Sequence, residues 1–102
     1  MDYQVILSTS SRKDLQDIVR YISLDDPLTA LQFGRFLIHH TKNLSQFPEQ
    51  GRVVPEFDED TIREIIVRNY RVIYRVNHDR KSIEVVRFWH AGRGRPIVGK
   101  ID

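Results

Sequence analysis

The stretch from Ile62 to Arg93 constrains the fold of this chain more than any other part of the sequence. It holds three segments rich in β-branched and aromatic residues, and we expect strands over 62–68, 70–76 and 83–89. The turns between these segments are too short for crossover connections, so neighbouring strands must run antiparallel. This part of the sequence therefore predicts a three-stranded meander.

The residues before the meander predict one strand and two helices. Alternation of apolar and polar residues over 3–8 indicates a strand. An apolar stripe at helical spacing predicts a first helix over 11–24, with Ser11 and Asp14 as its capping pair. A second helix is expected to begin at Pro27 and to run for about 20 residues. Both helices are amphipathic, so their apolar faces must pack on the sheet.

Together these elements predict an α+β domain with the order β-α-α-β-β-β. We expect an N-terminal strand and a helical hairpin packed on an antiparallel sheet that ends in the meander. The 102 residues suffice for one domain, and 48–61 is expected to be a loop. Residues 96–102 form a tail that could add an edge strand, pack on the core or be disordered.

Alternation along the middle strand predicts which face of the meander is buried. Tyr70, Val72, Tyr74 and Val76 share the face that we expect to pack on the helices. The opposite face carries Arg71, Ile73 and Arg75. Burying an arginine without a partner is costly, so this second face is expected to be open to water or to a ligand.

The last strand is largely apolar on both faces. Simple alternation places Val86, Phe88 and His90 on one face. The other face carries Val85, Arg87 and Trp89. Two apolar faces are typical of an interior strand or of a strand covered by another chain, and we expect Trp89 to lie in the core.

Charge is distributed unevenly along the chain. Residues 1–61 hold six Lys or Arg against ten Asp or Glu, a balance of −4, whereas residues 62–102 hold ten against four, a balance of +6. This asymmetry is typical of a protein with a polyanionic or acidic partner, and a merely solvated basic face is the alternative.

Composition excludes several kinds of site. The chain has no cysteine, which excludes disulfides and thiolate zinc sites, and its four histidines lack the spacing of metal ligands. We therefore expect no metal and no cofactor. Neither a membrane-spanning run nor a signal peptide is recognisable, so we expect a cytoplasmic protein without membrane contact.

A candidate site lies where the meander ends. Pairing of the last two strands in the expected register would bring Arg71 close to His90 and Arg93. Guanidinium and imidazole groups would then meet at one end of the sheet, where they could bind an anion. A structural hydrogen bond is the alternative role for His90.

The motifs NYRVIYRV and WHAGR, preceded by GRVVPEF and a two-helix half, resemble the RelE/ParE superfamily of bacterial type II toxin–antitoxin toxins. The resemblance covers about residues 3–95 and rests on the order and spacing of the motifs. It implies a toxin that forms a hetero-oligomer with a cognate antitoxin, which neutralises it.

The resemblance implies two possible targets. RelE-like and YoeB-like members cleave messenger RNA on the ribosome, whereas ParE-like members inhibit DNA gyrase and are not nucleases. WHAGR and GRVVPEF are closer to the ParE-like branch, and His90 is followed by Ala91 rather than by the tyrosine of the YoeB-like pattern. The ParE-like branch is therefore the one we favour.

The alternative is a metal-independent endoribonuclease. The resemblance then assigns Glu56 as the base for a ribose 2′-hydroxyl, Arg71 and Arg93 as stabilisers of the phosphorane, and His90 as the acid. A loop salt bridge is the competing role for Glu56. A non-toxic nucleic-acid-binding module or a degenerate family member is a further alternative. The arginines expected to contact a nucleic acid or another target are Arg63, Arg68, Arg75 and Arg87.

Overall fold

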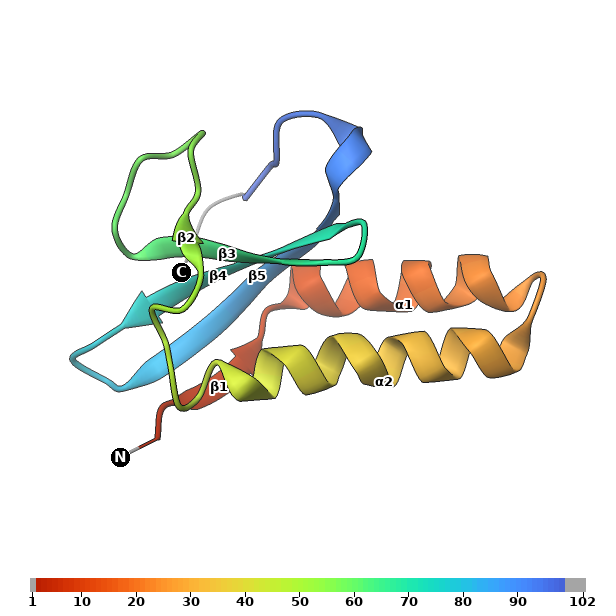
Figure 1. Cartoon of the computed structure of the whole chain (residues 1–102), viewed down its shortest axis with the longest axis horizontal. Coiled ribbons are helices and arrows are strands. Elements are labelled where there is room, and N and C mark those ends of the chain that lie inside the picture. The colour runs from red at the N-terminus through yellow and green to blue at the C-terminus, as the bar shows by residue number, and fades with distance from the viewer. Residues whose placement is uncertain (1, 99–102) are drawn as a thin grey trace.

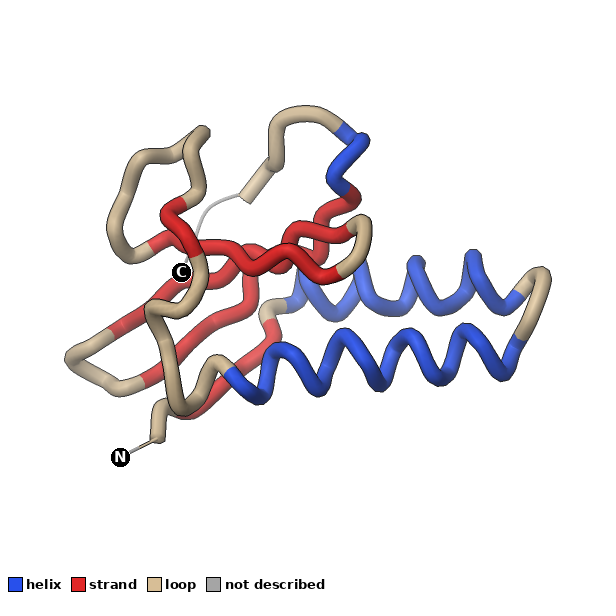
Figure 2. Tube along the Cα trace, viewed as in Figure 1, coloured by secondary structure: helices blue, strands red, loops and turns tan. Residues whose placement is uncertain are grey.

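The computed structural model describes residues 2–98, and it contains two helices and a single sheet beside them (Figures 1 and 2). In chain order the elements are β1 (Gln4–Leu7), α1 (Thr9–Ser23), α2 (Pro27–Asn43), β2 (Arg52–Val53), β3 (Ile62–Val67), β4 (Tyr70–Asn77), β5 (Ser82–His90) and the 3-10 helix η1 (Ala91–Arg93). Neither helix of this described part is long and apolar enough to cross a membrane. The predicted α+β fold and its element order are confirmed, with β2 as an additional short strand.

The sheet is mixed rather than wholly antiparallel. Its strand order is β1-β5-β4-β3-β2, and β1 runs parallel to β5 while all other neighbours are antiparallel. The last strand of the meander, β5, lies next to the first strand of the chain, β1. Local turn lengths predict the meander but carry no information on this long-range pairing.

The caps and bounds of the two helices differ in part from the prediction, since α1 runs from Thr9 to Ser23 rather than over 11–24. The cap of α1 is Ser8, whose side chain accepts a hydrogen bond from the Ser11 amide at 3.0 Å. Asp14 is therefore not a capping residue, and Ser11 is buried. Asp26 caps α2 as predicted, but α2 ends at Asn43 and spans 17 residues.

The inner face of the sheet packs on the helices as predicted. Val72, Tyr74 and Val76 of β4 are buried in one cluster with Ile18 of α1 and Leu37 of α2. Tyr70 is half-buried and packs against the same cluster. The main core thus lies between the helical hairpin and the meander.

A bulge in β5 changes the alternation that we predicted for this strand. Ile73 pairs with Arg87 but Tyr74 pairs with Val85, so Val86 is an extra residue in the ladder. Val85 and Phe88 consequently belong to the inner cluster, and Val86 belongs to the outer one. The prediction that Val86 and Phe88 share a face is wrong, because a bulge shifts the period of two by one residue.

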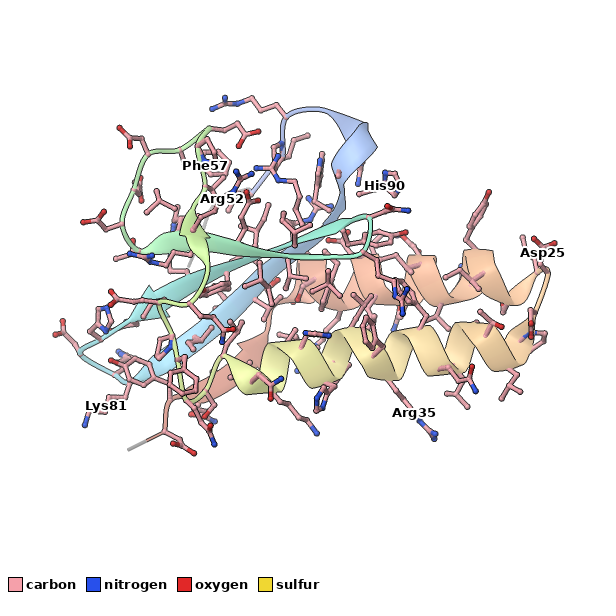
Figure 3. All side chains as sticks on the ribbon, in the orientation of Figure 1. Asp25, Arg35, Arg52, Phe57, Lys81 and His90 are labelled. Atoms are coloured by element: carbon pink, nitrogen blue, oxygen red, sulfur yellow. The ribbon has the colours of Figure 1, made fainter. Side chains whose placement is uncertain are left out.

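The outer face of the sheet is covered by the chain itself. A second cluster forms there from Val54, Ile62, Ile73, Val86 and Trp89, with Phe57 and Val98 packed against it. The expectation of an open or partner-covered face is therefore wrong over this region, whereas the buried position predicted for Trp89 is confirmed. Figure 3 shows Arg52 and Phe57 on the side of the sheet away from the helices.

Candidate functional site

Arg71 lies on the outer face and is bound by two carboxylates. Its Nε donates to Glu64 Oε1 at 2.6 Å, and its two terminal nitrogens donate to the Glu56 carboxylate at 2.9 and 2.6 Å. Every guanidinium nitrogen is thus engaged, and the residue is only 8% exposed. The prediction that Arg71 faces water is wrong, because two carboxylates compensate the cost of burying its charge.

The ion pairs continue beyond Arg71. Glu64 is fully buried, and its second oxygen accepts from Arg52 Nε at 2.7 Å. Arg95, in the C-terminal segment, donates to the Glu56 carbonyl at 2.9 Å. We call the series Arg52–Glu64–Arg71–Glu56 the outer ion-pair chain. This series holds the segment that begins with β2 on the outer face, and the hydrogen bond from Arg95 attaches the C-terminal segment to it.

The outer ion-pair chain also fixes protonation states. Hydrogen bonds from Arg71 lower the pKa of Glu56 from its ordinary value of 4.5 to about 2, against the opposing effect of burial. The same pair raises the pKa of the Arg71 guanidinium. Glu56 is accordingly a weakly basic carboxylate at neutral pH, which makes it a poor acceptor for a ribose proton.

His90 lies on the opposite face of the sheet. It pairs with Tyr70 across the β4–β5 ladder, with ring centroids 5.2 Å apart, whereas Arg71 pairs with Trp89. Neighbouring residues of a strand point to opposite faces, so the predicted meeting of Arg71 and His90 does not occur. The His90 side chain is exposed, and its Nδ1 accepts from the Gly92 amide at 3.0 Å.

A groove runs between the helical hairpin and the end of the meander, and we call it the hairpin groove. One part is a cavity of about 630 Å³ and a second part is a cavity of about 500 Å³. Tyr21, Tyr70 and His90 line both parts. Figure 3 shows His90 at the end of the meander that meets this groove. Burial raises the pKa of the Tyr70 hydroxyl, and Tyr21 adds to the shift.

Two exposed arginines border the hairpin groove. Arg68 lines its larger part and lies over the Phe36 ring, 4.7 Å from the centroid. Arg93 lines the smaller part and lies over the Trp89 ring at 4.0 Å. The smaller part is also lined by Asp14 and Asp17. The larger part combines an aromatic floor with the Arg68 cation and has no acidic residue in its lining, a combination that fits an anionic or acidic partner.

Two of the other arginines expected to bind a target, Arg87 and Arg63, make hydrogen bonds within the chain. Arg87 binds Asp14 through two hydrogen bonds of 2.7 and 2.8 Å, and this carboxylate raises its pKa. Arg63 donates to the carbonyls of Asp60 and Gly51 at 3.0 and 2.9 Å. Arg75 is half-buried, and its Nε has no hydrogen-bond partner within the described part of the chain. Of the four arginines named as contacts, only Arg68 is exposed, whereas Arg63, Arg75 and Arg87 are half-buried.

Three residues of these sites were not predicted from the sequence. Glu64 and Arg52 complete the outer ion-pair chain, and Tyr21 lines the hairpin groove. The one acidic residue of the strand 62–67 was the available signal for Glu64, since a buried carboxylate requires a partner. Tyr21 and Arg52 carried no comparable signal.

Within residues 2–98 no group of histidine and carboxylate side chains could hold a metal ion. A sequence comparison with curated proteins finds no match. The fold is similar to that of two solved structures, both of toxin–antitoxin systems. A chromosomal ParDE system from P. aeruginosa matches with a TM-score of 0.71 and 22% identity, over 86% of this chain and 95% of that one.

The second structure is the RelBE2 toxin–antitoxin complex from Mycobacterium tuberculosis, with a TM-score of 0.67 and 19% identity, over 88% of this chain and 92% of that one. Identities this low establish the shared fold alone. The family model described as "ParE toxin of type II toxin-antitoxin system, parDE" matches residues 5–94, almost the whole chain. The protein belongs to the ParE toxin family of type II toxin–antitoxin systems.

Proposed function

We propose that this toxin arrests growth by inhibiting DNA gyrase and that a cognate antitoxin neutralises it. Membership of the ParE family supports the proposal, as does the likeness to the ParDE system. The observation that carries it is the state of Arg71, whose guanidinium nitrogens are all bound by Glu56 and Glu64.

The alternative nuclease needs a carboxylate, a guanidinium and an imidazole around one ribose phosphate. In this chain Glu56 and Arg71 bind each other on the outer face, and His90 lies on the inner face. Freeing Arg71 would leave the buried Glu64 without one of its two cationic partners, which is strongly unfavourable. These features favour a toxin that binds its target without cutting RNA.

One observation favours RNA cleavage as the second candidate. His90 is exposed and shares the smaller part of the hairpin groove with Arg93. An imidazole and a guanidinium in one groove could bind a phosphodiester and protonate its leaving oxygen. Such a nuclease would work without Arg71 and without Glu56, since both lie on the other face.

Induction of the protein in growing bacteria separates the two candidates. We expect growth arrest, loss of negative supercoiling in plasmids and intact translated messages, with growth restored by co-expression of the antitoxin. Growth of cells that contain soluble, folded protein would contradict the toxin proposal. Codon-phased cuts in messages that disappear in His90→Ala would identify the nuclease instead.

A further inference from the structure

The free end of the helical hairpin carries large apolar side chains in contact with water. Figure 1 shows this end projecting beyond the sheet. Tyr21, Leu24 and Leu28 are 77%, 80% and 64% exposed, although they lie within eight residues of one another. We call residues 21–28 the hairpin tip. A cluster of exposed apolar side chains at a projecting end is typical of a protein interface.

The hairpin tip is also acidic. Asp25 and Asp26 form the turn between the helices, and both are exposed. Hydrogen bonds from Thr29 lower the pKa of Asp26, so this cap is charged at neutral pH. A surface that receives the hairpin tip must therefore offer apolar contacts and a cation.

The hairpin groove has both properties. Phe33, Phe36 and Tyr70 line its larger part, and the exposed Arg68 stands at the border. The groove begins at the tip itself, since Tyr21 belongs to both surfaces. One side of the molecule thus carries the acidic apolar tip next to the larger part of the groove, which is apolar and has Arg68 at its border.

From this complementarity we infer that two copies of the chain associate through this side, with each hairpin tip in the hairpin groove of the other copy. Two hairpins placed antiparallel about a twofold axis make both contacts at once, and the interface closes on itself. Leu24 and Leu28 of one copy then cover the aromatic floor of the other, and Asp25 faces Arg68. The inference is independent of the target proposed above.

The arrangement explains why the hairpin tip and the hairpin groove are adjacent on one chain. A partner that used only the groove would leave Leu24 and Leu28 in water. A twofold pair buries tip and groove on both copies and pairs their charges twice. Exposed charge pairs are individually weak, so we expect a dissociation constant in the micromolar range that rises with salt.

Sedimentation velocity of the full chain over roughly 1–100 µM tests this inference. We expect a dimer that Arg68→Asp weakens at least tenfold, because the new carboxylate faces Asp25 twice. Asp25→Lys should weaken it similarly, and the two changes together should restore it. Aspartate is chosen because Arg68 has a positive φ of 54°, which aspartate tolerates.

Matched controls come from the other end of the molecule. Lys81 is also exposed, also lies in a hairpin turn with a positive φ of 50°, and is labelled far from Asp25 in Figure 3. Lys81→Asp should leave the dimer unchanged. Leu24→Ser should weaken it more than Phe47→Ser, which alters another exposed apolar side chain, 65% exposed against 80% for Leu24.

Three results would overturn the inference. The first is a monomer throughout this concentration range. The second is a dimer that Arg68→Asp and Lys81→Asp weaken equally. The third is a dimer weakened by both charge changes singly and not restored by their combination. Binding of the antitoxin to the tip and groove of a monomeric toxin would also replace the second copy as occupant.

Discussion

At the scale of single residues, the outer ion-pair chain holds four charged side chains in place on the outer face of the meander. Glu64 is fully buried, and its two oxygens bind Arg52 and Arg71. Glu56 then binds Arg71 from the segment that follows β2. Removing one member leaves its partner charged and buried, so the series behaves as a unit.

Glu64→Gln tests that unit at its buried centre. A neutral amide can still accept hydrogen bonds but removes the charge that Arg52 and Arg71 share, which leaves Arg71 with Glu56 as its remaining carboxylate partner. We expect the free energy of unfolding to fall by about 3 kcal/mol in urea titrations at pH 7. Glu49→Gln is the control, because Glu49 is exposed and lies 4.0 Å from Arg63, and it should change stability by less than about 0.5 kcal/mol. Equal effects of the two substitutions would contradict a structural role for Glu64.

Acid should weaken the fold through Glu56. Its pKa is about 2 in the folded protein against an ordinary 4.5, so its contribution to stability is present above pH 4.5 and is lost as the pH falls towards 2. Glu56→Gln should lower the free energy of unfolding by about 1–2 kcal/mol at pH 7. The difference between the two proteins should shrink steadily below pH 4.5. A difference that stays constant from pH 7 to pH 2.5 would show that the Glu56 carboxylate is not held by Arg71.

At the scale of elements, Asp14 joins α1 to β5. Its carboxylate accepts two hydrogen bonds from Arg87 and a third from the Phe88 amide at 3.0 Å. The bulge at Val86 places Arg87 and Phe88 where one carboxylate reaches both. Helix α1 is thereby held on the strand that ends at His90 and at the hairpin groove.

The substitution Asp14→Asn tests how much this contact between α1 and β5 contributes to the free energy of unfolding. The amide keeps the size of the side chain but loses the charge that binds Arg87, so we expect a loss of about 2–3 kcal/mol in the free energy of unfolding. The control is Asp17→Asn one turn later, where an exposed carboxylate pairs with Lys13 at 3.3 Å. That change should cost at most about 0.5 kcal/mol. Thermal or urea unfolding measures both, and matching losses would show that Asp14 contributes no more than a surface charge.

At the scale of the whole molecule, the sequence predicts the helices and the buried face of the sheet better than it predicts the candidate functional site. Apolar periodicity predicted both helices and the inner face of β4, because these features depend on local spacing. The parallel pairing of β1 with β5 and the bulge at Val86 depend on contacts far apart in the chain. No local pattern could have predicted either of them.

The candidate site was predicted only in part for the same reason. His90, Arg68 and Arg93 are exposed at the end of the meander, which is where the sequence placed a functional surface. Only the alternative nuclease assigned Arg71 and Glu56 a role on a substrate, and in the structure these two side chains bind each other. The buried Glu64 on the neighbouring strand binds the Arg71 guanidinium. Alternation along β4 alone could not predict this ion pair.

The overall shape suits a protein that acts by binding. An elongated hairpin projects from the sheet (Figure 1). The chain itself covers much of the outer face of the sheet, and the groove lies between hairpin and meander. The hairpin carries the exposed Tyr21, Leu24 and Leu28, and the exposed Arg68 and Arg93 line the groove. A large macromolecular target fits such a surface better than a small substrate does.

Supercoiling of relaxed plasmid by purified gyrase tests the proposed function most directly. We predict that the added toxin stops supercoiling at concentrations near that of gyrase and that the antitoxin restores it. A translation extract treated with the same toxin should keep its messages intact. Full supercoiling in the presence of excess folded toxin, together with codon-phased cuts in those messages, would contradict the proposed function.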